Sequence, residues 1–158
     1  MRSFLYPATF TPDTQEGGLV VTFPDLPEAI TQGDDVSEAL QQAADCLDEA
    51  IAGRIRRHES IPEASAVGPD QYVISLPVST AAKAALHLAL QQARIAHSEL
   101  AERLHCDEQE VTHLLNPRRM ASLSRVESAL GALGYQLVLG MQAKIIPPFY
   151  VAAVVKPP

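Results

Sequence analysis

The sequence has little of several residue types, and each shortage excludes a class of protein. The two cysteines, Cys46 and Cys106, are sixty positions apart and form no CxxC pair, which excludes a disulfide framework. His105 adjoins Cys106 and two more histidines lie eight positions to either side of it, but adjacent side chains rarely aim at one zinc ion. We therefore expect neither a metal nor another cofactor.

Long hydrophobic runs are also missing. The best apolar stretch, at 145–155, is interrupted by Pro147 and Pro148 and is too short to cross a bilayer. The first residues carry one arginine and a brief apolar stretch cut by Pro7 and Pro12, unlike the hydrophobic region of a signal peptide. The sequence predicts a cytoplasmic protein without membrane contact.

Basic residues are scarce in the first half of the chain. Residues 1–79 contain four basic and thirteen acidic residues, a net charge of −9, whereas residues 80–158 contain eight and six, a net charge of +2. The first half repels nucleic acid and the second tolerates it. This asymmetry indicates two modules with different partners, although a merely solvated acidic surface explains the charge equally well.

What the first half does contain is a pattern of strands around one helix. Residues 3–10 and 19–23 favour strands and are joined by turn residues, and a third short strand is expected at 29–31. Asp35 and Glu38 form a capping box that opens a helix with one apolar stripe. Residues 71–76 alternate as a fourth strand. One helix covers only one face of the sheet, which leaves the other face or an edge for a partner.

The second half predicts helices and one final strand. The apolar spacing indicates four helices and then a strand, at residues 80–93, 98–104, 108–115, 122–133 and 135–141. The predicted class is α+β: a β-β-β-α-β domain at 1–78, an all-α domain with a C-terminal strand at 79–141, and a tail of unassigned role at 142–158.

Two of these short helices have the spacing of a helix-turn-helix. A small residue, Ala101, lies on the apolar face of the first helix. Three residues separate the first helix from the second. Asp107 caps the second helix with Glu110 as its capping-box partner. This geometry is typical of DNA-binding helix-turn-helix proteins, and a helical dimerisation module using the same packing is the alternative.

The outward positions of the second helix have the chemistry to read DNA. Gln109 can bond adenine through its amide, and the arginines just past the helix can grip phosphates. Glu108 and Glu110 add negative charge here, so we expect two copies to act together on DNA. The candidate DNA-binding residues are His97, Glu108, Gln109, Thr112, His113, Asn116, Arg118 and Arg119.

Both halves together resemble the HicB family of antitoxins, from type II toxin-antitoxin pairs. The first half carries the family's FPDLP segment, its T-x-G turn and its EA helix start, at 23–27, 31–33 and 38–39. In the second half, SELAERL and QEVTHLLN look like the Cro and lambda-repressor type of helix-turn-helix. The chain departs from the pattern at Glu28 and His105, where glycine is frequent, and at Ala96, where a polar cap is usual.

The resemblance implies a partner and a fold. It implies that residues 1–78 form a partial ribonuclease-H-like domain that blocks a HicA-type toxin, a small basic messenger-RNA-cleaving protein with a double-stranded-RNA-binding-like fold. It also implies binding to operator DNA. Carboxylates that could steer the encounter with a basic toxin are Asp25, Asp34, Asp35 and Glu38, the last two of which also fit a purely capping role.

Two other functions compete with this interpretation. A ribonuclease-H-like nuclease needs several carboxylates on two metal ions, and the first strand has no acidic residue, so we expect no enzyme. A ligand-sensing helix-turn-helix regulator without a toxin is the second, although the sequence offers no glycine-rich phosphate loop and no clear polar pocket. For assembly, we expect Tyr135, Leu137 and Leu139 to pair two chains into a homodimer or a higher oligomer.

Overall fold

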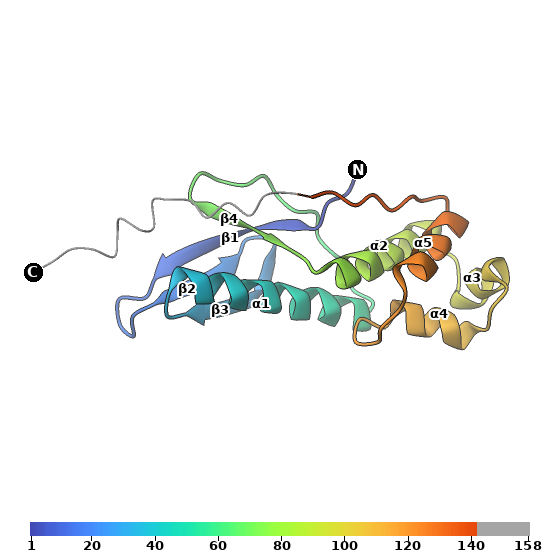
Figure 1. The fold of residues 1–158 in the computed structure, drawn as a ribbon, viewed down its shortest axis with the longest axis horizontal. Coiled ribbons are helices and arrows are strands. Elements are labelled where there is room, and N and C mark those ends of the chain that lie inside the picture. The colour runs from blue at the N-terminus through green and yellow to red at the C-terminus, as the bar shows by residue number, and fades with distance from the viewer. Residues whose placement is uncertain (142–158) are drawn as a thin grey trace, which may run out of the picture.

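The computed structural model describes residues 1–141, and the predicted tail at 142–158 lies outside the described residues. A four-stranded antiparallel sheet in the order β3-β2-β1-β4 is built from β1 (Leu5–Pro12), β2 (Leu19–Phe23), β3 (Leu26–Gly33) and β4 (Gln71–Ser75). Helix α1 (Val36–Arg56) lies along one face of this sheet (Figure 1). The mixed α+β class predicted from the sequence is confirmed.

Strand β3 is longer than predicted. The sequence suggested only residues 29–31, but pairing resumes at Leu26, which lies opposite Phe23 across a two-residue turn. A bulge between Thr22 and Phe23 then shifts the register. Pro27 can stay in the strand because β3 is at the edge of the sheet, where a missing N–H costs no ladder bond.

Gly33 sets how closely β3 approaches α1. A Cβ built on Gly33 would lie 2.4 Å from the backbone nitrogen of Ala39, closer than real Cβ contacts come. Ala39 itself is completely buried. The start of α1 can therefore rest against the end of β3 only while residue 33 has no side chain.

The predicted capping of α1 is confirmed with one difference. The Asp35 side chain accepts a hydrogen bond from the Glu38 backbone nitrogen at 2.9 Å. The Glu38 carboxylate in turn accepts from the backbone nitrogen of Asp34 at 2.8 Å, one residue earlier than a standard capping box uses.

Four helices follow the sheet, as predicted: α2 (Val78–Ala93), α3 (His97–Leu104), α4 (Glu108–Leu115) and α5 (Leu123–Ala132). The strand predicted at 135–141 is wrong. This segment has no strand structure, and although Leu137 packs partly against the helices, Val138 and Leu139 are more than half exposed. A strand requires a hydrogen-bonded neighbour, and within residues 1–141 of this single chain the segment pairs with none.

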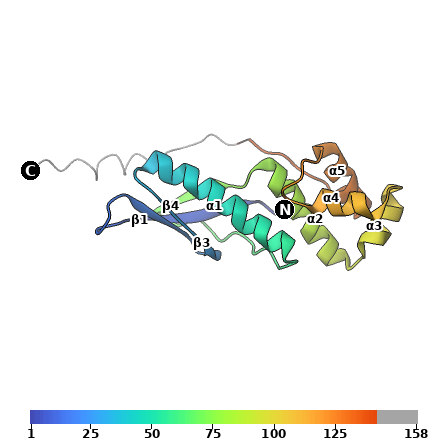
Figure 2. The ribbon, with the colours of Figure 1, turned by 90° about the horizontal axis from the view of Figure 1, so that it is seen from below.

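Helix α2 belongs to two hydrophobic cores. It runs between α1 and the remaining helices (Figure 2). Three of its side chains pack in or against the core of the sheet and α1, namely Ala81, Ala84 and Leu88. Four others are buried in the core with α3, α4 and α5, namely Ala82, Leu86, Ala89 and Leu90.

Lys83 places a cation inside this helical group. Its side chain is almost fully buried, and its ammonium donates to the backbone carbonyls of Asn116 and Arg119. Asn116 caps the C-terminal end of α4, where the helix dipole favours a positive charge. Burial lowers the pKa of Lys83. Lys83 thus ties α2 to the end of α4 and to the turn that follows.

We expect Lys83→Met to lower the free energy of unfolding by about 1–3 kcal/mol, because the two carbonyls would lose their buried donor. Chemical denaturation at a fixed protein concentration measures this. Ala93→Met, at an exposed position of the same helix, is the control and should change stability by less than about 0.5 kcal/mol. A Lys83→Met protein as stable as this control would contradict the role given to the ammonium.

Candidate functional site

The four carboxylates predicted to contact a toxin lie in two places. Asp34, Asp35 and Glu38 lie together where β3 passes into α1. Asp25 lies in the turn at the other end of β3, about 25 Å away for an eight-residue strand. The structure therefore brings three of the four together and separates Asp25 from them.

Three of these carboxylates already have structural partners. Asp25 accepts from the backbone nitrogen and the hydroxyl of Ser65, at 3.0 and 3.2 Å, and so holds the loop before β4. Asp35 and Glu38 cap α1, as described above. Within residues 1–141, the Asp34 carboxylate makes no hydrogen bond or ion pair, and it is exposed. Of the set, Asp34 is the one whose charge is available without rearrangement.

Two acidic residues further along α1 were not among the predicted contacts. Asp45 and Glu49 are exposed and follow Glu38 by seven and eleven residues, which places all three on one side of the helix. We call Asp34, Glu38, Asp45 and Glu49 the acidic stripe. The helical spacing of these carboxylates in the sequence is the signal that could have identified it.

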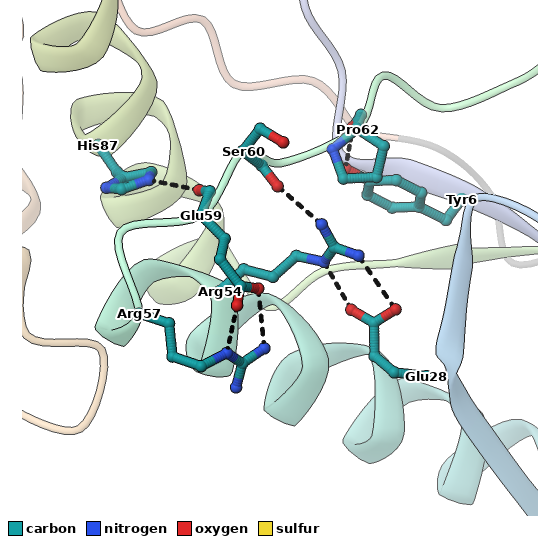
Figure 3. A network of polar contacts seen from close by, with 8 residues as sticks. All are labelled: Tyr6, Glu28, Arg54, Arg57, Glu59, Ser60, Pro62 and His87. Atoms are coloured by element: carbon teal, nitrogen blue, oxygen red, sulfur yellow. Dashed lines mark hydrogen bonds and ion pairs between the residues drawn. The ribbon is translucent and has the colours of Figure 1, made fainter.

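At the C-terminal end of α1, two arginines form ion pairs with glutamates that lie outside the helix (Figure 3). Arg54 binds Glu28 through two hydrogen bonds of 2.5 and 3.1 Å and also donates to the carbonyl of Ser60 at 2.8 Å. The Arg54 guanidinium lowers the pKa of Glu28. Arg57 pairs in the same way with Glu59. Glu28, one of the departures from the family pattern, therefore fastens β3 to the end of α1.

Helices α3 and α4 are joined by three residues and pack through buried side chains that include Leu100, Ala101 and Val111. The first connecting residue, His105, has φ 53° and ψ 43°, the left-handed conformation that glycine adopts without strain. The second, Cys106, is half-buried against the helical core. The third, Asp107, caps α4 by accepting from the backbone nitrogen of Glu110 at 2.7 Å.

The predicted DNA-binding residues on α4 are only partly free. Glu108, Gln109 and Thr112 are exposed along one face of the helix, whereas His113 is half-buried. The Thr112 hydroxyl donates to the Glu108 carbonyl at 3.0 Å. Asn116 uses its side-chain oxygen to accept from the Arg118 backbone nitrogen, so it shapes the turn after the helix.

The charged residues around α4 differ in their partners. Glu110 was predicted to complete a capping box, but its carboxylate binds Arg125 of α5. Arg118 reaches across to α1 and binds Glu49 at 2.7 Å. The Arg119 side chain is exposed and has no ion pair within residues 1–141. His97 lies on another helix, at the first position of α3.

No three His, Cys, Asp or Glu side chains of residues 1–141 gather as metal ligands would. None of the described helices is both long enough and apolar enough to span a bilayer. A cavity of about 610 Å³, which the sequence did not indicate, opens between the end of α1, α2 and the pair α3 and α4.

The left-handed conformation of His105 generates a stability prediction. His105→Gly should raise the free energy of unfolding by about 1 kcal/mol, because it removes the clash between Cβ and the backbone. His105→Ala keeps that Cβ and should give no gain, so it separates backbone strain from any effect of the imidazole. Denaturant titration of both variants measures the difference, and equal stability of the two would contradict the strain.

Comparisons with known proteins support the resemblance to the HicB family. Residues 5–85 match the family model described as the HicB-like antitoxin of bacterial toxin-antitoxin systems. The chain is 40% identical over 136 residues to Antitoxin HicB of Escherichia coli (strain K12), which covers 86% of this chain and 98% of that protein. It is 36% identical over 142 residues to Antitoxin HicB 1 of Photorhabdus laumondii, covering 90% of each. The chain therefore belongs to the HicB-like antitoxin family.

Proposed function

We propose that this protein is an antitoxin that binds and neutralises a HicA-type toxin and represses its own operon. The observation that carries the antitoxin role is the family match over residues 5–85, a region that takes in the whole sheet, α1 and the first half of α2. The relatives that match along most of the chain bear the name antitoxin. A toxin-antitoxin family implies a toxin as partner.

The acidic stripe supports a way of binding such a toxin. A messenger-RNA-cleaving toxin needs a basic surface for RNA phosphates, and carboxylates spaced along α1 offer that surface a competing set of negative charges. Opposite charges steer the encounter and raise the association rate. Asp34, Asp45 and Glu49 are the exposed members of the stripe that do not cap the helix. The antitoxin thereby occupies the position of the RNA.

The sheet and α1 serve this function as a scaffold. We propose that residues 1–78 form the toxin-binding module, of a partial ribonuclease-H-like fold, and that it is not an enzyme. β1 carries no carboxylate that could hold a catalytic metal ion. Binding, and no cleavage of RNA, is the activity that we assign to this module.

Helices α3 and α4 support the second half of the proposal. We interpret them as a helix-turn-helix in which α4 enters the major groove of operator DNA. Gln109 and Thr112, exposed on α4, face the bases, while Arg118 and Arg119 bind phosphates. Glu108 lies on the same face, where its carboxylate can accept from cytosine. We assign DNA binding and dimerisation to residues 79–141.

Two copies are needed for tight binding, because this module has few basic residues. We propose that the segment 135–141 joins them. Tyr135, Val138 and Leu139 are exposed there, and a second chain would cover this apolar surface.

The toxin interaction predicts a charge effect at the start of α1. Asp34→Lys should lower the association rate with the purified toxin by about fivefold to tenfold at low salt, because it reverses a steering charge. The difference should shrink as the salt concentration rises. Stopped-flow mixing of full-length antitoxin with toxin measures it.

Asp70→Lys is the matched control for this experiment. Asp70 is exposed and precedes β4, on the opposite edge of the sheet from Asp34. An equal loss in both variants would contradict the acidic stripe as the contact surface. A purified chain that held no basic toxin through size-exclusion chromatography would contradict the antitoxin function itself.

The DNA interaction predicts a gain of function at Glu49. The side chains of Arg118 and Glu49 are 65% and 61% exposed, so their ion pair contributes at most about 1 kcal/mol. Glu49→Gln should tighten binding to promoter DNA several-fold, because it frees Arg118 and removes a carboxylate near the phosphates. Fluorescence anisotropy with a labelled promoter fragment measures this.

Asp45→Asn, one turn earlier on α1, makes the same change of net charge without touching Arg118. Equal gains in both variants would show that only net charge matters. The specific role of the Glu49 and Arg118 pair would then be refuted.

A further inference from the structure

The cavity between the two groups of elements has the size of a small-molecule site. Its volume of about 610 Å³ lies within the usual range for ligand pockets, roughly 300–1,000 Å³. Its walls come from the C-terminal end of α1 and the residues after it, from the second half of α2, from the start of α3 and from the end of α4. A ligand here would touch both hydrophobic units of the chain.

The charged residues that line this cavity are two arginines, Arg94 and Arg56, the second of which pairs with Glu49 at 3.9 Å, and three histidines add imidazole nitrogens. Five of the lining side chains are arginines or histidines, namely Arg56, His58, His87, Arg94 and His97. No aspartate or glutamate is among the lining residues. This is unusual in a chain with a net charge of −7 and nineteen acidic residues. The concentration of basic groups favours an anionic ligand.

Some of these groups are held in place and others are free to bind. His87 is buried, and its Nε2 donates to the Glu59 carbonyl at 2.9 Å, which orients the ring (Figure 3). Gln91 donates to the carbonyl of His58 at 3.3 Å. The Arg94 guanidinium is exposed and has no hydrogen bond or ion pair with any other residue of the described part of the chain. Arg94 is therefore the main candidate to meet the charge of a ligand.

The start of α3 adds a second feature that favours an anion. Ala96 precedes the helix and supplies no side-chain hydrogen bond to the first backbone N–H groups. Unpaired N–H groups at a helix N-terminus attract negative charge. His97, the first residue of this helix, lines the cavity. Ala96, which departs from the family's usual polar cap, therefore leaves these N–H groups without a side-chain acceptor beside the arginines of the cavity.

Five of the other lining residues are apolar, which separates this site from a phosphate-binding surface. They are Ile55, Leu90, Ile95, Leu115 and Pro117. A DNA backbone presents no apolar body that would gain from covering such residues. A small molecule with both an apolar body and a charged group would gain from both parts of the wall.

We propose that this cavity binds a small organic anion, one that combines an apolar body with a single carboxylate, sulfonate or phosphate group. The apolar body packs on Leu90, Ile95 and Leu115. The anionic group meets Arg94 at the end of α2 and the start of α3. This ligand would be bound in addition to the proposed toxin and DNA, and its site shares Thr112 with the face of α4 that we assign to DNA.

The test uses a defined probe, 8-anilinonaphthalene-1-sulfonate, an aromatic monoanion. It is titrated into the full-length, isotopically labelled protein and followed by two-dimensional amide NMR. The amide signals of Gln91, Thr112 and Asn116, which line the cavity, should shift together and saturate. N-phenyl-1-naphthylamine, which has the same ring system without the sulfonate, should bind about tenfold more weakly, because it lacks the charge-assisted contacts.

Variants assign the charge recognition to particular residues. Arg94→Gln should weaken binding of the sulfonate by about tenfold and leave binding of the neutral amine unchanged. His97→Gln is a second variant, on a separate helix, and it should also weaken binding of the sulfonate. Arg119→Gln removes an equal charge from an exposed position that does not line the cavity, and it should have no effect.

Several results would overturn the proposal. Equal affinity for the sulfonate and the neutral amine would contradict recognition of the charge. Equal affinity of the Arg94→Gln and Arg119→Gln variants for the sulfonate would contradict the role of Arg94. Shifts confined to residues 135–141 would show that the dye binds the exposed apolar segment. Displacement of the dye by a short DNA duplex of unrelated sequence, with shifts of the same amides, would assign the cavity to the DNA surface.

Discussion

The structure depends on a helix that is buried from two sides. α2 supplies alanine and leucine side chains to the core under the sheet and to the core of the helical group, so neither core is complete without it. Small alanines allow two sets of elements to approach one helix closely. The buried ammonium of Lys83 then fixes α2 against the end of α4. The family match ends within this helix, at residue 85, so the matched region alone does not contain the whole of the shared element.

The same arrangement brings opposite charges of the two units together. Glu49 belongs to the acidic stripe of α1, and Arg118 follows the helix that we assign to DNA. Their contact places the proposed toxin surface and the proposed DNA surface in direct electrostatic contact at one point. Because both side chains are mostly exposed, either can exchange this contact for a partner of opposite charge at little energetic cost.

Local sequence signals predicted the elements well and the long-range contacts poorly. Helix positions, the cap at Asp35, the cap at Asp107 and the crossing of two short helices all follow from patterns within a few residues. The edge position that lets Pro27 stay in β3 is set by strand order, which no local pattern contains. The strand expected at 135–141 failed for a related reason, because a strand is defined by its neighbour and the described chain supplies none.

In the candidate site, too, local features were predicted and long-range contacts were not. Exposure of Gln109 and Thr112 followed from the helical period, whereas the partners of Glu110, Arg118 and Asp25 lie on elements far away in the sequence.

The close contact between Gly33 and Ala39 has a consequence for recognition. It holds the backbone that carries Asp34, Asp35 and Glu38 in one geometry before any partner arrives. Association of the toxin, which we propose for this corner, would then lose little conformational entropy, and more of the electrostatic attraction would remain as affinity.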